Sequence, residues 1–211
     1  MTLGFGVCAL GGCIEYQLIY HGDGAGGCPD AVQEWDSGES VSTTTERVSA
    51  PSGYALTGVR VFREPSANLD NFVARFDVEF TRYSESSGLI RWTDDTVVET
   101  VYNGEFRSDS GVWVRAEEDE WITGLTAYVQ NRDGYLKDVV VTSSRILSTG
   151  VSGTSSEGPA LGLSGRIFRL GCGDCDSVQL IDEVEIEWDT RRGKTRRLEI
   201  HCGSYSYDRV D

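Results

Sequence analysis

The sequence predicts an all-β protein built from three repeated units of paired strands. Three observations lead to this class: a composition rich in turn-forming residues, alternation of apolar and polar residues with period two, and internal repetition. The chain has 211 residues, which is enough for a self-sufficient core, and all-β folds of this length are often one domain. We therefore expect residues 1–211 to form a single domain with a cysteine cluster near each end.

The composition favours short strands joined by turns, and it argues against two classes of partner. There are 25 glycines, four prolines and one methionine, a balance that is unlike that of a helical bundle. The formal charge of −15 argues against nucleic acid and anionic membrane surfaces, because affinity for phosphates comes largely from Lys and Arg. No stretch approaches the roughly 20 apolar residues that cross a bilayer. We expect no nucleic-acid partner and no membrane span.

Residues 182–202 are a candidate hairpin. In the first half three glutamates alternate with apolar side chains, so we expect the glutamates on a solvated face of the sheet. Apolar residues alternate again after a polar turn. A register that pairs Trp188 with Arg196 places Glu187 opposite Arg197, which is a modest cross-strand charge pair.

Internal repetition suggests how the strands are grouped. ALTGVRVF at residues 55–62 matches WITGLTAY at residues 121–128, and both carry a Thr-Gly pair at the same place. Each is followed by a polar turn and a β-rich run. We take residues 166–188 as a third, more divergent copy. Three units that each bury one face must pack those faces together, and three sheets around an axis form a prism, although repetition alone also allows a sandwich or a trefoil.

The segment LIDEVEIEWD at residues 180–189 resembles the closing strand of jacalin-related lectins, including the zymogen-granule type. The repeat units also resemble those of vitelline membrane outer layer proteins, which share that fold. The resemblance covers residues 47–82 and 112–188. It implies a β-prism I fold, with three antiparallel Greek-key sheets around a pseudo-threefold axis.

The resemblance also implies a sugar site. Jacalin-type lectins hold sugar hydroxyls with a Gly-x-x-x-Asp loop, in which the carboxylate accepts hydrogen bonds and glycine lets the sugar approach the backbone. Residues 134–138 match this spacing in full. We expect Gly134, Tyr135 and Asp138 to contact the sugar, with the Tyr135 ring offered to sugar C–H groups. The alternative is a tight turn with a solvated carboxylate.

The other two units match the sugar motif less well. Residues 178–182 keep Asp182 but have Val178 in place of glycine, and residues 66–70 keep only the aspartate. The family also uses a glycine-rich segment near the N-terminus, and Gly11 and Gly12 are the candidates for it. Beside Cys13 these glycines fit the alternative of a bridge position equally well.

The six cysteines form two groups of three, and the middle of the chain has none. If all six pair internally, at least one bridge must join the two groups, since three cysteines cannot pair among themselves. Even pairing indicates an oxidising compartment, and free cytosolic thiols are the alternative. The cysteines are Cys8, Cys13 and Cys28 in the first group and Cys172, Cys175 and Cys202 in the second.

Other chemistry is less well supported by the sequence. The Cys172-x-x-Cys175 spacing suits a disulfide better than a redox or zinc motif, because no helix is expected after it. Acidic runs at residues 94–95, 117–120 and 174–176 offer oxygen ligands for calcium but show no EF-hand pattern, so we expect no cofactor and a solvated acidic surface. With two histidines and no catalytic motif, we expect no enzyme activity.

These observations predict a secreted, extracellular, lectin-like protein whose partners are glycans or glycoproteins. The alternative is a structural matrix, coat or fibre component that self-associates. An exposed Trp or Tyr beside an aspartate-bearing loop would favour the lectin. A broad apolar patch, or a strand edge paired with another copy, would favour assembly.

Overall fold

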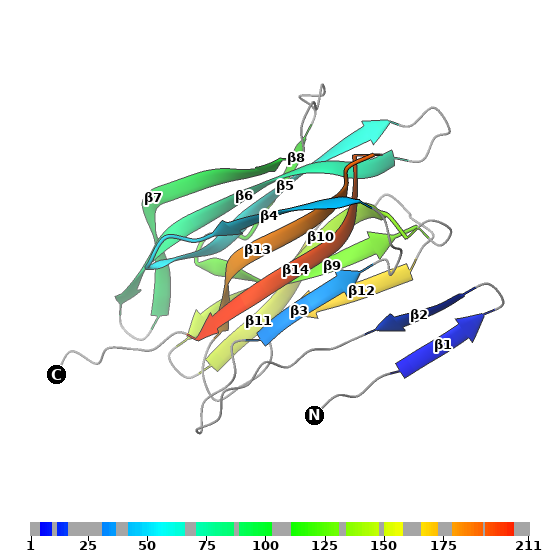
Figure 1. The fold of residues 1–211 in the computed structure, drawn as a ribbon. Coiled ribbons are helices and arrows are strands. Elements are labelled where there is room, and N and C mark those ends of the chain that lie inside the picture. Colours follow the sequence, from blue (N-terminus) through cyan, green and yellow to red (C-terminus); the bar gives the residue numbers. More distant parts are fainter. Residues whose placement is uncertain are drawn as a thin grey trace.

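The fold is known from a computed structural model (Figure 1). It describes residues 5–9, 12–16, 31–36, 42–65, 71–86, 89–102, 111–130, 134–147, 150–157, 166–172, 179–191 and 193–204. In these residues all regular structure is β-strand. A search of the same residues finds no helix long and apolar enough to cross a membrane. The strands are β1 (Phe5–Ala9), β2 (Gly12–Tyr16), β3 (Ala31–Asp36), β4 (Thr43–Ser49), β5 (Tyr54–Pro65), β6 (Asn71–Ser86), β7 (Leu89–Tyr102), β8 (Val112–Arg115), β9 (Glu120–Val129), β10 (Leu136–Leu147), β11 (Gly150–Glu157), β12 (Arg166–Gly171), β13 (Gln179–Asp189) and β14 (Lys194–Ser204).

Twelve of these strands form three antiparallel four-stranded groups, and β1 and β2 form a separate hairpin. The first group has the order β8-β5-β6-β7 and the second the order β12-β9-β10-β11. A single residue pair, Leu89 with Leu147, links these two groups into one sheet. The third sheet has the order β4-β13-β14-β3. The three-sheet β-prism expected from the sequence is confirmed.

Each group has the same Greek-key connectivity. The first two strands of a unit form the centre, the third pairs with the second, and the fourth pairs with the first. In the third sheet the central strands β13 and β14 come late in the chain, whereas the outer strands β3 and β4 come early. Figure 1 shows the blue β3 and β4 on either side of the orange and red hairpin. Strands from the early and the late parts of the chain therefore share this sheet.

The third repeat begins one strand later than the sequence suggested. We aligned β12 with the central strands β5 and β9, but β12 is an outer strand that pairs with β9. The strand equivalent to β5 and β9 is β13, which pairs with β14 and β4. The alignment was wrong because alternation and a glycine-containing turn occur in outer strands as well as in central ones.

Two bulges recur in all three units. On the first central strand the extra residue is Thr57 in the first unit, Thr123 in the second and Asp182 in the third, as the register shifts beside these residues show. Gly58 and Gly124 therefore occupy the same position in their units, as the repeat predicted. On the second central strand the extra residue is Ala74, Lys137 or Arg196. Bulges bend a strand and increase its twist, so this pair shapes each sheet in the same way.

The backbone carbonyl of each residue at the first bulge accepts a hydrogen bond from the residue that follows the fourth strand of the same unit. Thr57 accepts a hydrogen bond from the Ala116 N–H at 2.9 Å, and Thr123 accepts one from the Cys172 N–H at 2.9 Å. Asp182 accepts the equivalent bond from Ala50 at 2.6 Å. This contact fixes the loop between consecutive units at one end of the prism. We call that end, which carries Thr57, Thr123 and Asp182, the bulge end.

The inward faces of the three sheets form the core. It is made of buried aliphatic and aromatic side chains contributed by every unit, including Phe76, Phe80, Ile122, Val139, Ile186, Trp188, Leu198 and Ile200. At the bulge end a smaller cluster of Ala55, Trp121 and Leu180, which are equivalent residues of the three units, continues this core.

One disulfide is described, between Cys172 after β12 and Cys202 on β14, and it ties the second group to the third sheet. The two cysteines belong to the same C-terminal trio. The predicted bridge between the two trios therefore stays a prediction. The side chains of the other four cysteines, Cys8, Cys13, Cys28 and Cys175, lie outside the described residues.

Candidate functional site

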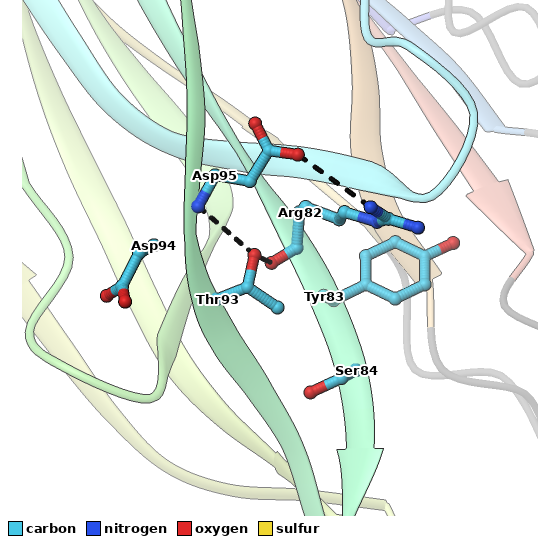
Figure 2. A pocket seen from close by; sticks show the side chains of 6 residues that line it. All are labelled: Arg82, Tyr83, Ser84, Thr93, Asp94 and Asp95. Carbon is cyan, nitrogen blue, oxygen red and sulfur yellow. Dashed lines mark hydrogen bonds and ion pairs between the residues drawn. The ribbon is translucent and has the colours of Figure 1, made fainter.

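Two surface pockets lie at the bulge end. The larger, with a volume of about 580 Å³, lies at the β6–β7 hairpin, and we call it the β7 pocket. The smaller, of about 230 Å³, lies in the third sheet beside Asp182, and we call it the β13 pocket. The β7 pocket is lined by Arg82, Tyr83, Ser84, Thr93, Asp94 and Asp95 (Figure 2).

An irregular bulge of β7 creates the β7 pocket. Between two consecutive residue pairs of the β6–β7 ladder, β6 contributes one residue, Arg82, whereas β7 contributes residues 93–95. The Thr93 hydroxyl donates a hydrogen bond to the Arg82 carbonyl at 3.2 Å, and it accepts one from the Asp95 N–H at 3.2 Å. These bonds replace the lost ladder bonds, so the two aspartates are held on an ordered excursion of the strand.

The Asp95 carboxylate is positioned by a tyrosine of β5, the strand on the other side of β6. The Tyr54 hydroxyl donates a hydrogen bond to Asp95 Oδ2 at 2.5 Å, and this bond raises the pKa of Tyr54 above its ordinary value. The Arg82 Nη1 atom lies 3.8 Å from the same oxygen (Figure 2). The Asp95 side chain is still 51% exposed, so a ligand can reach the carboxylate.

Tyr83 forms the inner wall of the β7 pocket. Its ring contacts the Trp121 ring edge to face, with 6.0 Å between the ring centres. Burial raises the pKa of the Tyr83 hydroxyl, and the negative charge of Asp182 raises it further. Tyr83 remains partly exposed. It therefore offers ring surface to the pocket while it lies within electrostatic reach of Asp182.

The β13 pocket arises because the third unit departs from the pattern of the other two. In those units the hydroxyl of the bulge residue pairs with a hydroxyl on the next strand, Thr57 with Thr81 at 2.7 Å and Thr123 with Ser144 at 3.0 Å. The equivalent pair in the third unit is Asp182 and Gly203. A Cβ atom at Gly203 would overlap the Asp182 carboxylate, so glycine is needed for Asp182 to lie there.

Polar side chains form the rest of the β13 pocket. Ser49 donates a hydrogen bond to Glu183 Oε2 at 2.5 Å. The Nε2 atom of His201 lies 2.8 Å from Glu199 Oε1 and 3.2 Å from Glu183 Oε1. The pocket therefore presents carboxylate and imidazole groups that suit a polar ligand. Across the residues the structure describes, no group of three or more His, Cys, Asp or Glu is arranged to hold a metal ion.

The predicted Gly134–Asp138 loop lies at the opposite end of the prism. Gly134 has the positive φ of 67° that favours glycine, as the motif requires. However, Tyr135 and Asp138 are fully buried. The Tyr135 hydroxyl donates to Asp189 Oδ2 at 2.9 Å, and Asp138 Oδ1 accepts the Val139 N–H at 2.9 Å. The expectation of an accessible tyrosine ring and carboxylate is wrong, because both side chains are used inside the fold.

The other predicted sugar residues are scattered. The register places Arg75 and Arg197 at the positions equivalent to Asp138, so Asp182 does not repeat the Asp138 motif as expected. Asp182 instead lines the β13 pocket. Gly12 begins β2, and Gly11 lies outside the described residues.

Sequence reasoning missed Tyr54, Tyr83 and His201. The available signal was the pair Asp94-Asp95, which interrupts the alternation of β7 with two adjacent carboxylates. From the sequence alone, that pair is a calcium candidate or part of a solvated acidic surface. The involvement of Tyr54 depends on strand register, which a single sequence does not reveal.

No protein-family model matches the chain, and no curated protein matches it. Among solved structures, Malaysian banana lectin is similar over 83% of this chain and 99% of its own, with 12% identity and a TM-score of 0.47. A Calsepa lectin in complex with a bisected glycan is similar over 82% of this chain and 97% of its own, with 13% identity and a TM-score of 0.45. A prostate-specific WGA16 glycoprotein lectin is similar over 79% and 94%, with 15% identity and a TM-score of 0.47. At these identities none of them assigns a function to this chain.

Proposed function

We propose that the protein binds carbohydrate through the β7 pocket, without catalysis. The observation that carries this proposal is that Tyr83, which is partly exposed, lines the same pocket as Asp94 and Asp95, which lie on one ordered bulge of β7. The sequence predicts that an exposed Trp or Tyr near an aspartate-bearing loop favours a lectin, and the partly exposed Tyr83 meets this expectation in part. A volume of about 580 Å³ lies within the range of small-ligand pockets.

The chemistry of the pocket suits a sugar. The Asp95 carboxylate can accept hydrogen bonds from sugar hydroxyls, and Arg82 can donate to them. The Tyr83 ring gives an apolar surface to sugar C–H groups. Because Tyr54 already holds one Asp95 oxygen at 2.5 Å, the carboxylate is oriented before the ligand arrives, which lowers the entropic cost of binding.

We propose further that the protein is secreted. The Cys172–Cys202 disulfide supports an oxidising compartment, since such bonds are rare in reducing cytosol. Self-association into a coat or fibre is less well supported. The large apolar side chains found exposed in the described part are Val98, Val112 and Ile167, which lie on three different strands. Single exposed apolar residues are normal on a monomer.

The test is a glycan array, run with and without calcium, on the wild type and three variants. Asp95→Ala should remove binding and lower the thermal unfolding midpoint only slightly, because the contacts that it loses with Tyr54 and Arg82 are exposed to solvent. Glu99→Ala, which removes another exposed carboxylate of β7, is the matched control and should bind normally.

Asp138→Ala separates the two candidate places for the sugar. If the Gly134–Asp138 loop is the site, this variant loses binding while Asp95→Ala keeps it. If the β7 pocket is the site, the reverse holds. A wild type that binds no glycan, with or without calcium, would remove the proposed function altogether.

A further inference from the structure

We infer that the β7 pocket and the β13 pocket are two subsites of one extended site, which takes an oligosaccharide chain rather than a single sugar. This inference rests on the proposed function, since it concerns the ligand of the same pocket. It is carried by the turn that lies between the two pockets.

The turn of residues 50–54 touches both pockets. At its start Ala50 lines the β13 pocket and donates its N–H to the Asp182 carbonyl at 2.6 Å. At its end Tyr54 donates its hydroxyl to Asp95 in the β7 pocket. Four residue steps span at most about 14 Å. The Cα atoms of Ala50 and Tyr54, which serve the two pockets, are therefore no farther apart than one short oligosaccharide chain can span.

A backbone hydrogen bond joins Tyr83 of the β7 pocket to the same turn. The Tyr83 N–H donates to the Gly53 carbonyl at 3.0 Å, and Gly53 has a φ of 82°, which favours glycine. Burial raises the pKa of the Tyr83 hydroxyl, and the negative charge of Asp182 raises it further. A residue of one pocket thus lies within electrostatic reach of a residue of the other.

The β13 pocket exists because the third unit breaks a rule that the other two follow. In those units a threonine at the first bulge and a hydroxyl residue on the next strand form a hydrogen-bonded pair at this position. In the third unit Asp182 and Gly203 leave a pocket of about 230 Å³. Departures from a repeated local pattern concentrate at functional sites, and this one places a carboxylate next to the proposed sugar pocket.

The test compares chain lengths. Titration calorimetry measures the dissociation constants of a monosaccharide and of its linear di- to hexasaccharides. Glucose, mannose, galactose and N-acetylglucosamine series are used in turn. We expect the longer chains of the recognised sugar to bind at least about tenfold more tightly than the monosaccharide, since one further charge-assisted hydrogen bond strengthens binding by about that factor or more.

Two variants assign the added affinity to the β13 pocket. Asp182→Asn keeps the size of the side chain but removes its charge, and Gly203→Ala displaces the carboxylate without removing it. Both should remove the advantage of the longer chains and leave monosaccharide binding unchanged. Asp95→Ala should weaken both ligands, and Glu99→Ala neither. Thermal unfolding of each variant reports whether it is folded. If Gly203→Ala does not fold, Asp182→Asn still tests the inference.

The outcomes separate the two proposals. Equal affinity for monosaccharide and longer chains, or an unchanged length advantage in Asp182→Asn, overturns the extended site and leaves the proposed function standing. An equal loss for both ligands in Asp182→Asn overturns it too, because Asp182 would then belong to the monosaccharide site. Absence of binding by the wild type to any series removes the proposed function itself.

Discussion

The ammonium nitrogen of Lys194 lies 3.5 Å from the centre of the Phe72 ring. It lies 4.9 Å from the centre of the Tyr135 ring, and the two rings contact each other edge to face. All three residues stand two positions before the second bulge of their units. Equivalent residues of the three units thus meet at the end of the prism opposite the bulge end, as two aromatic rings and one cation.

Replacing Lys194 by methionine tests the energetic weight of this cluster. Lys194→Met keeps the apolar stem but removes the charge, and we expect a loss of about 0.5–2 kcal/mol in the free energy of unfolding, the range of cation–π contacts. Urea denaturation monitored by Trp fluorescence measures it. Arg145→Met, which removes an exposed cation of β10, should change stability by less than about 0.5 kcal/mol. Equal losses in the two variants would contradict the prediction.

The hydroxyl pair at the first bulge can be tested by a double-mutant cycle. Thr57 and Thr81 are buried and their Oγ1 atoms lie 2.7 Å apart. Thr57→Val should cost about 1–3 kcal/mol, because it leaves the Thr81 hydroxyl without this buried partner. The double variant Thr57→Val, Thr81→Val should cost less than the sum of the two single variants. Simple additivity would mean that the pair contributes no coupling.

The turn before β9 carries a residue with unfavourable backbone geometry. Asp119 has a φ of 64°, and the equivalent residue before β5 is Gly53, with a φ of 82°. Asp119→Gly should therefore raise the free energy of unfolding by up to about 1 kcal/mol, because glycine carries little penalty in this region. Gly53→Ala should lower it. A destabilised Asp119→Gly would show that the ion pair with Arg91, at 3.9 Å, outweighs the strain.

Removal of the described disulfide should destabilise the protein strongly. Cys172 and Cys202 are 30 residues apart, and the chain-entropy model gives about 3–4 kcal/mol for a loop of that length. The variant with both cysteines replaced by alanine should unfold at a correspondingly lower denaturant concentration. A loss below about 1 kcal/mol would mean that core packing holds the second group and the third sheet together without the bridge.

Parity then assigns the remaining C-terminal cysteine to the other end of the chain. With Cys172 bonded to Cys202, Cys175 is left without a partner in its own trio. If all six cysteines pair, Cys175 must bond to Cys8, Cys13 or Cys28. Mass spectrometry of unreduced peptides should find one such cross-linked peptide. A free thiol at Cys175 would refute the prediction.

The sequence predicted the fold well where a residue pattern repeats between units. It predicted the fold poorly where the alignment of a unit depends on how its strands pair. The Thr57-Gly58 and Thr123-Gly124 pairs made two units visible, because both mark the same bulge. The third unit has Asp182 and Glu183 at that place, and without the glycine its alignment was one strand early.

The C-terminal hairpin shows the same limit. Glu187 does pair with Arg197, as predicted, but Trp188 pairs with Thr195 because Arg196 is the bulge residue. Glu185 was expected on a solvated face, yet it is buried. The guanidinium groups of Arg47 and Arg197 cover its carboxylate. Alternation predicts the face of the sheet on which a side chain lies, but it does not predict whether neighbouring side chains bury it.

The candidate site was predictable only in part, since it depends on contacts between distant segments. Asp182 was named as a sugar residue, but its pocket needs Gly203 and the turn at Ala50, which the sequence does not place beside it. The motif at Gly134–Asp138 was found, but its tyrosine contacts Lys194 and Asp189 inside the fold, and both lie more than 50 residues away in the chain.

The split third sheet also governs when the protein can become native during synthesis. The hairpin partners β3 and β4 emerge from the ribosome about 130 residues before β13. The first two groups can form as they are made, whereas β3 and β4 must wait with unpaired edges for the last strands. Such non-local pairing folds slowly and leaves strand edges open to wrong partners. A circular permutant that begins at β13 would make the strands of this sheet consecutive, because β14 would be followed by the segment that contains β3 and β4. We expect this permutant to refold faster and to aggregate less, with the same final stability.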